Sequence, residues 1–229
     1  MNYFLLFLIF ISFNLKADEI DQKAKICLKS LKKIHNVQDH KSAKKAFGIC
    51  LSQYIQIKTI APLGDEKDAT RFFEVIFKGL SIPYKTYRVP SFHLGQKHRY
   101  NLVATLSRDH SENYNWSKVE GKPGSIILTH HMDVVDVDPS NWIDSKLPFS
   151  GKIMIDETTG KEALWGRGTL DMKGVGILQL VTLVMLKSSK KLDKDVHFLA
   201  LSDEESLNSG AIGTLKSMQK NRPLHALTK

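Results

Sequence analysis

The sequence lacks the features of several specialised classes of protein. It contains no internal repeat and no low-complexity tract, and it has only 14 glycines and 7 prolines in 229 residues. These absences exclude a fibrous repeat protein. Hydrophobic residues make up 42% of the chain and charged residues 25%, which excludes an intrinsically disordered chain. The composition is that of a globular protein that buries one sizeable core.

Acidic residues are missing from the C-terminal end of the chain. The formal net charge is +9, and residues 206–229 carry four basic residues and no acid. Residues 18–60 carry nine lysines and four acids, whereas residues 61–205 carry 19 basic and 20 acidic residues. The central segment is therefore nearly neutral, and the basic flanks lack interleaved aromatic residues. We expect no nucleic-acid partner, because the charge forms no basic face on the folded core.

The apolar run at the N-terminus, residues 3–13, is too short to span a bilayer as a stable helix. It ends at Asn14, and Ala17 is a small residue at a possible cleavage site before Asp18. We therefore predict a signal peptide over residues 1–17 and an exported protein, periplasmic or secreted, with no membrane partner after cleavage. The alternative is an uncleaved N-terminal anchor.

Only two cysteines are present, Cys27 and Cys50, and both follow the predicted cleavage site. The segments KAKICLKSLKKI and SAKKAFGICLSQYI show apolar residues at helical spacing, separated by polar HNVQDH. This predicts two short antiparallel helices in a helical N-terminal segment, residues 18–60. In an oxidising compartment we expect a disulfide between them. Two buried free thiols are the alternative.

Residues 61–229 show alternating helix and strand patterns. RFFEVIFKGL is amphipathic, and YKTYRVP and RYNLVATL are typical of strands. SIILTHH and VHFLALS are short apolar runs typical of buried strands, and the apolar helix GVGILQLVTLVMLK lies between them. The order predicts an α/β fold, with a largely parallel central sheet flanked by helices on both faces. We interpret residues 61–229 as part of a catalytic domain.

One histidine and four acidic residues follow the predicted buried strands or open a helix. They are His131, Asp133, Asp171, Glu204 and Glu205. In open α/β sheets, ligands bind outside the carboxyl ends of strands. Four carboxylates gathered there would repel one another and take up protons unless a cation compensates their charge. The pattern therefore predicts a metal site.

The spacing within each motif indicates separate roles. His131 and Asp133 point the same way on extended backbone, so His131 becomes the metal ligand and Asp133 holds its other ring nitrogen. Of the adjacent acids Glu204 and Glu205, one can bind metal while the other acts as general base. A surface His–Asp pair and a solvated acidic turn are the alternatives.

The segment GRGTLDMKG allows a tight turn close to a ligand, with Asp171 at the start of a helix. It matches neither glycine-rich phosphate-binding pattern, which argues against a phosphate loop. The alternative is a glycine-rich turn in which Asp171 only caps the helix.

Taken in order, HMDVV, Trp142, LPFSG, WGRGTLDMKG and LSDEE resemble the zinc-dependent aminoacylase, acetylornithine deacetylase and glutamate carboxypeptidase superfamily. The upstream RYNLVATL is also similar to that family's strand before the metal histidine. The resemblance covers roughly residues 55–215 and is nearest to the secreted or vacuolar carboxypeptidase-like branch.

The resemblance implies a di-zinc metallohydrolase that cleaves amide or peptide bonds, of the carboxypeptidase, dipeptidase or aminoacylase type. His131 would bind one zinc, Asp171 would bridge two, and Glu205 would bind the second. Glu204 would be the general base and Asp133 the acid beside the histidine. The substrate would be a peptide or an N-acyl amino acid.

The chain departs from the family pattern after Glu205. The lid or dimerisation domain, a further carboxylate ligand and a late histidine are not recognisable, and His225 lies outside the pattern. We therefore expect that this chain is only the N-terminal part of the enzyme, truncated and of doubtful activity. A second half or a dimer partner would complement it. The alternative is a non-catalytic exported remnant or binding module.

Overall fold

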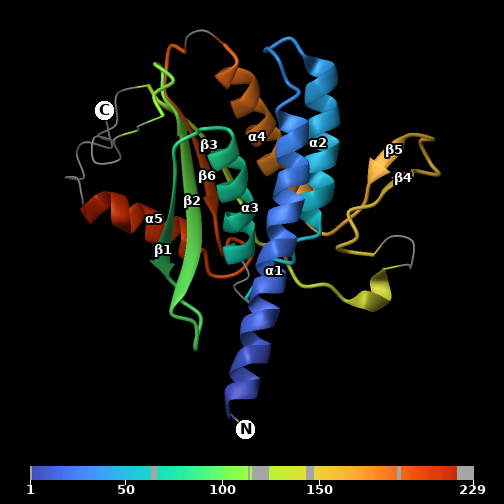
Figure 1. Cartoon of the computed structure of the whole chain (residues 1–229), viewed down its shortest axis with the longest axis vertical. Coiled ribbons are helices and arrows are strands. Elements are labelled where there is room, and N and C mark those ends of the chain that lie inside the picture. Colours follow the sequence, from blue (N-terminus) through green and yellow to red (C-terminus); the bar gives the residue numbers. More distant parts are fainter. Residues whose placement is uncertain are drawn as a thin grey trace.

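The computed structural model describes residues 2–62, 66–112, 114, 124–142, 147–189 and 192–220 (Figure 1). Its helices are α1 (Asn2–Leu31), α2 (His40–Ile55), α3 (Glu66–Gly79), α4 (Gly174–Lys187) and α5 (Ser209–Lys220). Its strands are β1 (Tyr84–Pro90), β2 (His98–Leu106), β3 (Ile126–His131), β4 (Ile153–Ile155), β5 (Glu162–Leu164) and β6 (Val196–Leu201). Short helical turns lie at Pro139–Asn141 and Thr169–Lys173.

A four-stranded sheet in the order β1-β2-β6-β3 forms the centre of the molecule. Strands β3 and β6 pair in parallel, with His131 opposite Leu201. Strand β2 pairs antiparallel with both β1 and β6. Strands β4 and β5 form a separate antiparallel hairpin. The prediction of an α/β fold with helices flanking a sheet is confirmed.

The prediction that this sheet is largely parallel is wrong, because β3 with β6 is its one parallel pairing among the described residues. Residues 91–97 join β1 to β2, and so short a connection allows only an antiparallel hairpin. The chain between β3 and β6 contains α4, and a crossover of this kind gives parallel neighbours.

Helices cover both faces of the sheet, as predicted. Helix α3 packs on β1 and β2 and α4 on β3 and β6, while α5 packs against β1 and β2. Figure 1 shows α3 and α4 on one side of the sheet and α5 on the other, with α1 and α2 outside α3 and α4. The apolar segment Thr169–Lys187 has the length and composition of a membrane span, but its helix α4 packs against the sheet and α2. We therefore interpret α4 as a core helix.

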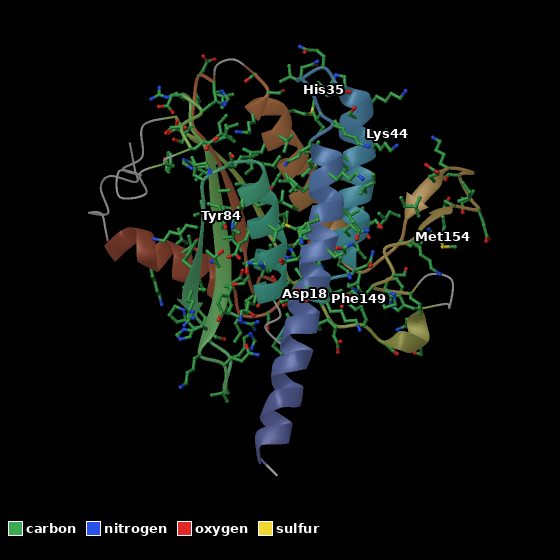
Figure 2. The ribbon with its side chains drawn as sticks, viewed as in Figure 1. Asp18, His35, Lys44, Tyr84, Phe149 and Met154 are labelled. Carbon is green, nitrogen blue, oxygen red and sulfur yellow. A yellow bond between two sulfur atoms is a disulfide. The ribbon has the colours of Figure 1, made fainter. Side chains whose placement is uncertain are left out.

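The predicted antiparallel helices at the N-terminus are present as α1 and α2, which pack along each other. Asp39 caps α2 by accepting a hydrogen bond from the Ser42 amide at 3.1 Å. Figure 2 shows His35 and Lys44 near the end of this hairpin. Helix α1 is longer than predicted, since it runs without a break from the apolar N-terminal run through Ala17. Removal of residues 1–17 stays a prediction.

Cys27 and Cys50 form a disulfide that joins α1 to α2, with their Cα atoms 4.5 Å apart. The predicted pairing is thus present in the structure. Both cysteines are buried in a core that also contains aromatic residues of α3. Tyr54 of α2 stacks on Phe72, with ring centroids 5.3 Å apart. Residues of the helical segment 18–60 therefore share one core with the sheet domain.

We expect this disulfide to stabilise the folded protein by about 3 kcal/mol, because it closes a loop of 23 residues in the unfolded chain. Urea unfolding with and without a reductant measures the difference. The control is the double variant Cys27→Ala/Cys50→Ala, whose unfolding should not respond to the reductant. Mass spectrometry that finds both thiols alkylated in non-reduced, exported protein would contradict the pairing.

Candidate metal centre

The predicted site residues meet at the carboxyl ends of the two parallel strands. His131 is the last residue of β3, and Glu204 and Glu205 lie in the turn that follows β6. Asp171 lies in the turn Thr169–Lys173, directly before α4. One donor atom each from His131, Asp171 and Glu205 lie within 4.8 Å of one another. The structure therefore brings together the three residues that the family resemblance implies as metal ligands.

The imidazole of His131 lies between these acids. Its Nε2 is 3.1 Å from Asp171 Oδ1 and 3.6 Å from Glu204 Oε2. The His131 side chain is only 5% exposed, whereas those of Asp171 and Glu204 are 77% and 52% exposed. The site thus has a buried floor and a side open to solvent, from which a substrate or water can approach.

The other ring nitrogen of His131 fixes the direction of the imidazole. Nδ1 lies 3.0 Å from the backbone carbonyl oxygen of Asp133 and 3.6 Å from the Asp133 carboxylate. A proton on Nδ1 is therefore donated to that carbonyl, which leaves the lone pair of Nε2 directed at the acids. The prediction that Asp133 orients His131 through its carboxylate is therefore only partly right. Asp133 orients the imidazole mainly through its main-chain carbonyl oxygen.

The Asp133 carboxylate binds the turn after β6 instead. Oδ1 accepts a hydrogen bond from the Glu204 amide at 3.0 Å, and Oδ2 accepts one from the Glu205 amide at 2.9 Å. Asp133 is completely buried. Its two charge-assisted hydrogen bonds join the end of β3 to the residues that carry the two glutamates.

The neighbouring His130 has a different environment. Its ring points into the core, where it contacts Phe73 and Phe198, and Nδ1 lies 3.2 Å from the Gln179 side chain. Complete burial lowers the pKa of His130 to about 3, so the ring is neutral. The alternation along β3 thus separates a core histidine from the site histidine, as the sequence predicts.

The turn that carries Asp171 needs a glycine at its start. Gly168 has φ of 81°, and a Cβ atom there would lie 2.6 Å from Val134 Cγ1. Asp171 itself has extended backbone, with φ −115° and ψ 100°, and α4 begins only at Gly174. Asp171 therefore does not occupy the helix start that the sequence predicts, and its carboxylate is free of a capping role.

Lys173 holds this turn in place, and the sequence reasoning missed it. The side chain is completely buried, and Nζ donates hydrogen bonds to the carbonyl oxygens of Ile57 at 2.5 Å and Tyr54 at 3.3 Å. Burial lowers the pKa of Lys173 to about 7, against the opposing effect of the Asp133 charge. Its partners are backbone carbonyls more than 100 positions away, which no local pattern reveals.

The charges of the site fit a bound cation. The pKa of Glu205 is raised, first by burial and then by the charges of Asp171, Asp133 and Glu204, whereas His131 lowers it. One imidazole and two carboxylates are donors that zinc accepts at about 2.0–2.2 Å. The three donor atoms lie within 4.8 Å of one another, and a cation among them would relieve the repulsion between the acids.

Other residues of the motifs lie outside this cluster. The Arg167 guanidinium lies over the ring of Trp142, 5.7 Å from its centroid. His225 lies outside the described residues, so no fourth donor is assigned to it.

Three curated proteins show the relationships of the chain. It is 29% identical to an acetylornithine deacetylase of Buchnera aphidicola over 71% of this chain and 37% of that protein. It is 31% identical to a probable succinyl-diaminopimelate desuccinylase of Staphylococcus aureus over 64% of this chain and 30% of that protein. It is 34% identical to a probable carboxypeptidase S-like protein of Dictyostelium discoideum, over 54% of this chain and 23% of that protein. The chain therefore spans only 23–37% of the length of these relatives.

Residues 127–228 match the model of Peptidase family M20/M25/M40. This stretch contains His131, Asp133, Asp171 and the glutamate pair, and the relatives above extend the similarity upstream. The resemblance that the motifs indicate is confirmed. Over these residues the chain is similar to the M20 peptidases and to their deacylase and carboxypeptidase-like relatives.

Proposed function

We propose that this chain carries the metal-binding and proton-transfer residues of a di-zinc hydrolase that cleaves amide or peptide bonds. The observation that carries the proposal is the convergence of His131, Asp171 and Glu205 within 4.8 Å, beside Glu204. The relatives support it, because a deacetylase, a desuccinylase and a carboxypeptidase-like protein are all named for splitting amide bonds.

Three residues would hold the metal. His131 would contribute the Nε2 lone pair that its Nδ1 contact leaves available, and Asp171 and Glu205 would contribute carboxylate oxygens. The resemblance of the motifs implies that Asp171 would be shared by two ions, with His131 on one and Glu205 on the other. Bound zinc would lower the pKa of coordinated water and polarise the scissile carbonyl.

Glu204 would act as the general base. Its side chain is half exposed, its carboxylate faces His131, and its amide is fixed by Asp133. From this position it can accept a proton from a water molecule as the water oxygen bonds to the amide carbon. The same carboxyl group then returns the proton to the leaving nitrogen as the C–N bond breaks, so Glu204 ends the reaction in its starting state.

The substrate class follows from the relatives rather than from the site. Acetylornithine and succinyl-diaminopimelate are N-acyl amino acids, and carboxypeptidases release C-terminal amino acids from peptides. We propose a peptide or an N-acyl amino acid as substrate. We also propose export of the protein, with residues 1–17 as its signal peptide, because the disulfide suits an oxidising compartment.

Zinc should bind the protein and stabilise it, and Asp171→Asn should weaken this binding at least tenfold. The substitution removes a charged donor of the proposed metal site. Because the Asp171 side chain is exposed, the same substitution should leave the metal-free fold intact. Thermal unfolding at increasing zinc concentration gives the affinity, and equilibrium dialysis gives the number of bound ions.

The matched control is Asp136→Asn, which removes an exposed carboxylate near the same strand end. It should leave zinc affinity unchanged. Equal zinc affinity in wild type and Asp171→Asn would contradict the assignment of Asp171, and a wild-type protein without zinc affinity would favour a non-catalytic remnant.

Glu204→Gln should lower the rate of hydrolysis of N-acyl amino acids or dipeptides by at least about 100-fold, since a neutral amide cannot accept the proton. Zinc affinity should stay within about threefold of wild type, because Glu204 is not among the proposed ligands. Steady-state kinetics on zinc-loaded protein, in a form that contains the rest of the enzyme, measures the effect.

The control is Glu157→Gln, an exposed acid in the loop that joins β4 to β5, which should keep full activity. Turnover by Glu204→Gln close to that of wild type would show that another group accepts the proton. Strong Glu204-dependent turnover by the 229-residue chain alone would contradict the expectation that this chain is of doubtful activity by itself.

A further inference from the structure

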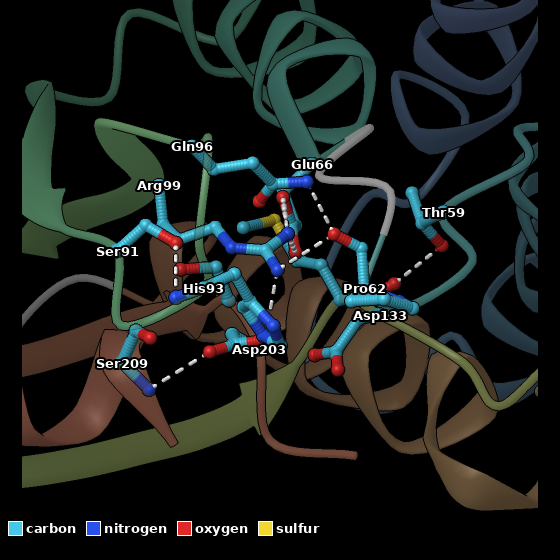
Figure 3. A network of polar contacts seen from close by, with 12 residues as sticks. Thr59, Pro62, Glu66, Ser91, His93, Gln96, Arg99, Asp133, Asp203 and Ser209 are labelled. Carbon is cyan, nitrogen blue, oxygen red and sulfur yellow. Dashed lines mark hydrogen bonds and ion pairs between the residues drawn. The ribbon is translucent and has the colours of Figure 1, made fainter. Parts of the chain in front are cut away.

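A buried arginine lies behind the turn that carries the two glutamates. Arg99 of β2 is completely buried, and its guanidinium lies between the carboxylates of Glu66 and Asp203 (Figure 3). Nη1 donates to the two oxygens of Glu66 at 2.9 and 3.2 Å, and Nη2 donates to Asp203 Oδ1 at 2.9 Å. Nη2 also donates to the carbonyl oxygen of Pro62 at 3.0 Å. One guanidinium thus joins three segments of the chain.

Asp203 directly precedes the glutamate pair, and its side chain is held from several sides. His93 Nε2 lies 2.7 Å from the same oxygen that Arg99 contacts, and the Ser209 amide donates to the other oxygen at 3.1 Å. The backbone of Asp203 has φ of 63°. This left-handed conformation is uncommon for residues other than glycine, although aspartate adopts it more readily than most.

The turn is therefore clamped on two sides. Asp133 accepts the amides of Glu204 and Glu205 from the direction of β3, and Arg99 binds Asp203 from the direction of β2. With the amides and the preceding side chain both fixed, the two glutamate side chains can leave the backbone only in a narrow range of directions.

We propose that Arg99 is a positioning residue for the metal centre. It acts through Asp203, whose backbone conformation directs Glu204 and Glu205 toward the donors of the proposed site. The inference rests on the proposed function for its purpose, but the geometry on which it depends is independent of any metal.

Loss of the guanidinium would leave two carboxylates, Glu66 and Asp203, buried without their shared cation. Buried unpaired charges are strongly unfavourable, so the turn would move Asp203 toward solvent or the acids would take up protons. Either change removes the contact that holds the turn. A lysine at position 99 keeps the charge but has no planar fork to reach both acids at once.

The alternative role for Arg99 is to fasten the start of α3 to the sheet through Glu66. The two roles are separable, because Glu66→Gln weakens the contact of Arg99 with α3 and leaves its hydrogen bond to Asp203. Arg71→Met is a matched control, since Arg71 of α3 makes a bidentate pair with Asp21 of α1 at 2.7 and 2.8 Å. It removes an Arg–carboxylate pair that does not involve the turn.

Amide hydrogen exchange of the metal-free protein, followed by mass spectrometry of peptides covering residues 202–206, tests the proposal. Arg99→Met should accelerate exchange of the Glu204 and Glu205 amides at least tenfold. Arg71→Met should leave these amides unchanged, and Glu66→Gln should affect α3 more than the turn. Wild-type exchange of the turn in folded Arg99→Met would overturn the proposal.

Arg99→Lys covers the case in which Arg99→Met does not fold. We expect exchange of the two amides at least threefold faster than in wild type, and unchanged exchange would again overturn the proposal. Zinc affinity separates positioning from stability: it should fall about 10–100-fold in folded Arg99→Met, but not in Arg71→Met. A wild type that binds no zinc would refute the proposed function, while the exchange data would still decide the role of Arg99.

Discussion

The candidate site depends on a buried carboxylate that joins the ends of two parallel strands. Beyond the last backbone hydrogen bond between β3 and β6, from the Met132 amide to the Leu201 carbonyl oxygen at 2.7 Å, the two loops need a further link to fix their separation. Asp133 supplies it by accepting the amides of Glu204 and Glu205. Hydrogen bonds to an ionised acceptor are about twice as strong as neutral ones, which offsets the cost of burying the charge. His131 and the glutamates thereby keep one relative position.

The completely buried charged side chains among the described residues lie at this end of the sheet, whereas the core between sheet and helices is mainly apolar. The core between sheet and helices contains aromatic clusters such as Phe73, Phe77 and Phe198, whose rings are about 5–6 Å apart. By contrast, Arg99 and Lys173 are completely buried beside the site. Apolar burial therefore accounts for most of the stability, and the buried ionic groups account for the geometry of the loops that carry the site.

The sequence predicted those features that depend on local pattern. The apolar runs located β3, α4 and β6, and the two-residue spacing in HMD distinguished His131 from His130, which the structure places in the core. The apolar content of the strands does not reveal the antiparallel pairing of β2, which depends on the short connection between β1 and β2. The role of Arg99 could not be predicted, because nothing in the pattern of its strand distinguishes it and its partner Asp203 is 104 positions away. Contacts of this kind leave no periodic signal.

The N-terminal hairpin is connected to the site through Lys173. The last carbonyls of a helix lack partners within the helix and carry its partial negative charge. Lys173 donates to two carbonyl oxygens at this end of α2, those of Tyr54 in its last turn and Ile57 just beyond it.

Because Lys173 lies two residues after Asp171, the end of α2 determines where the Asp171 turn can lie. Ile55 of α2 also packs so close to Gly166 that a side chain there would meet it at 2.4 Å. The Cys27–Cys50 disulfide holds α2 against α1, so it also stabilises the support on which this turn rests. The end of α2 and the residues just beyond it thus support the candidate metal centre, although none of them supplies a proposed ligand.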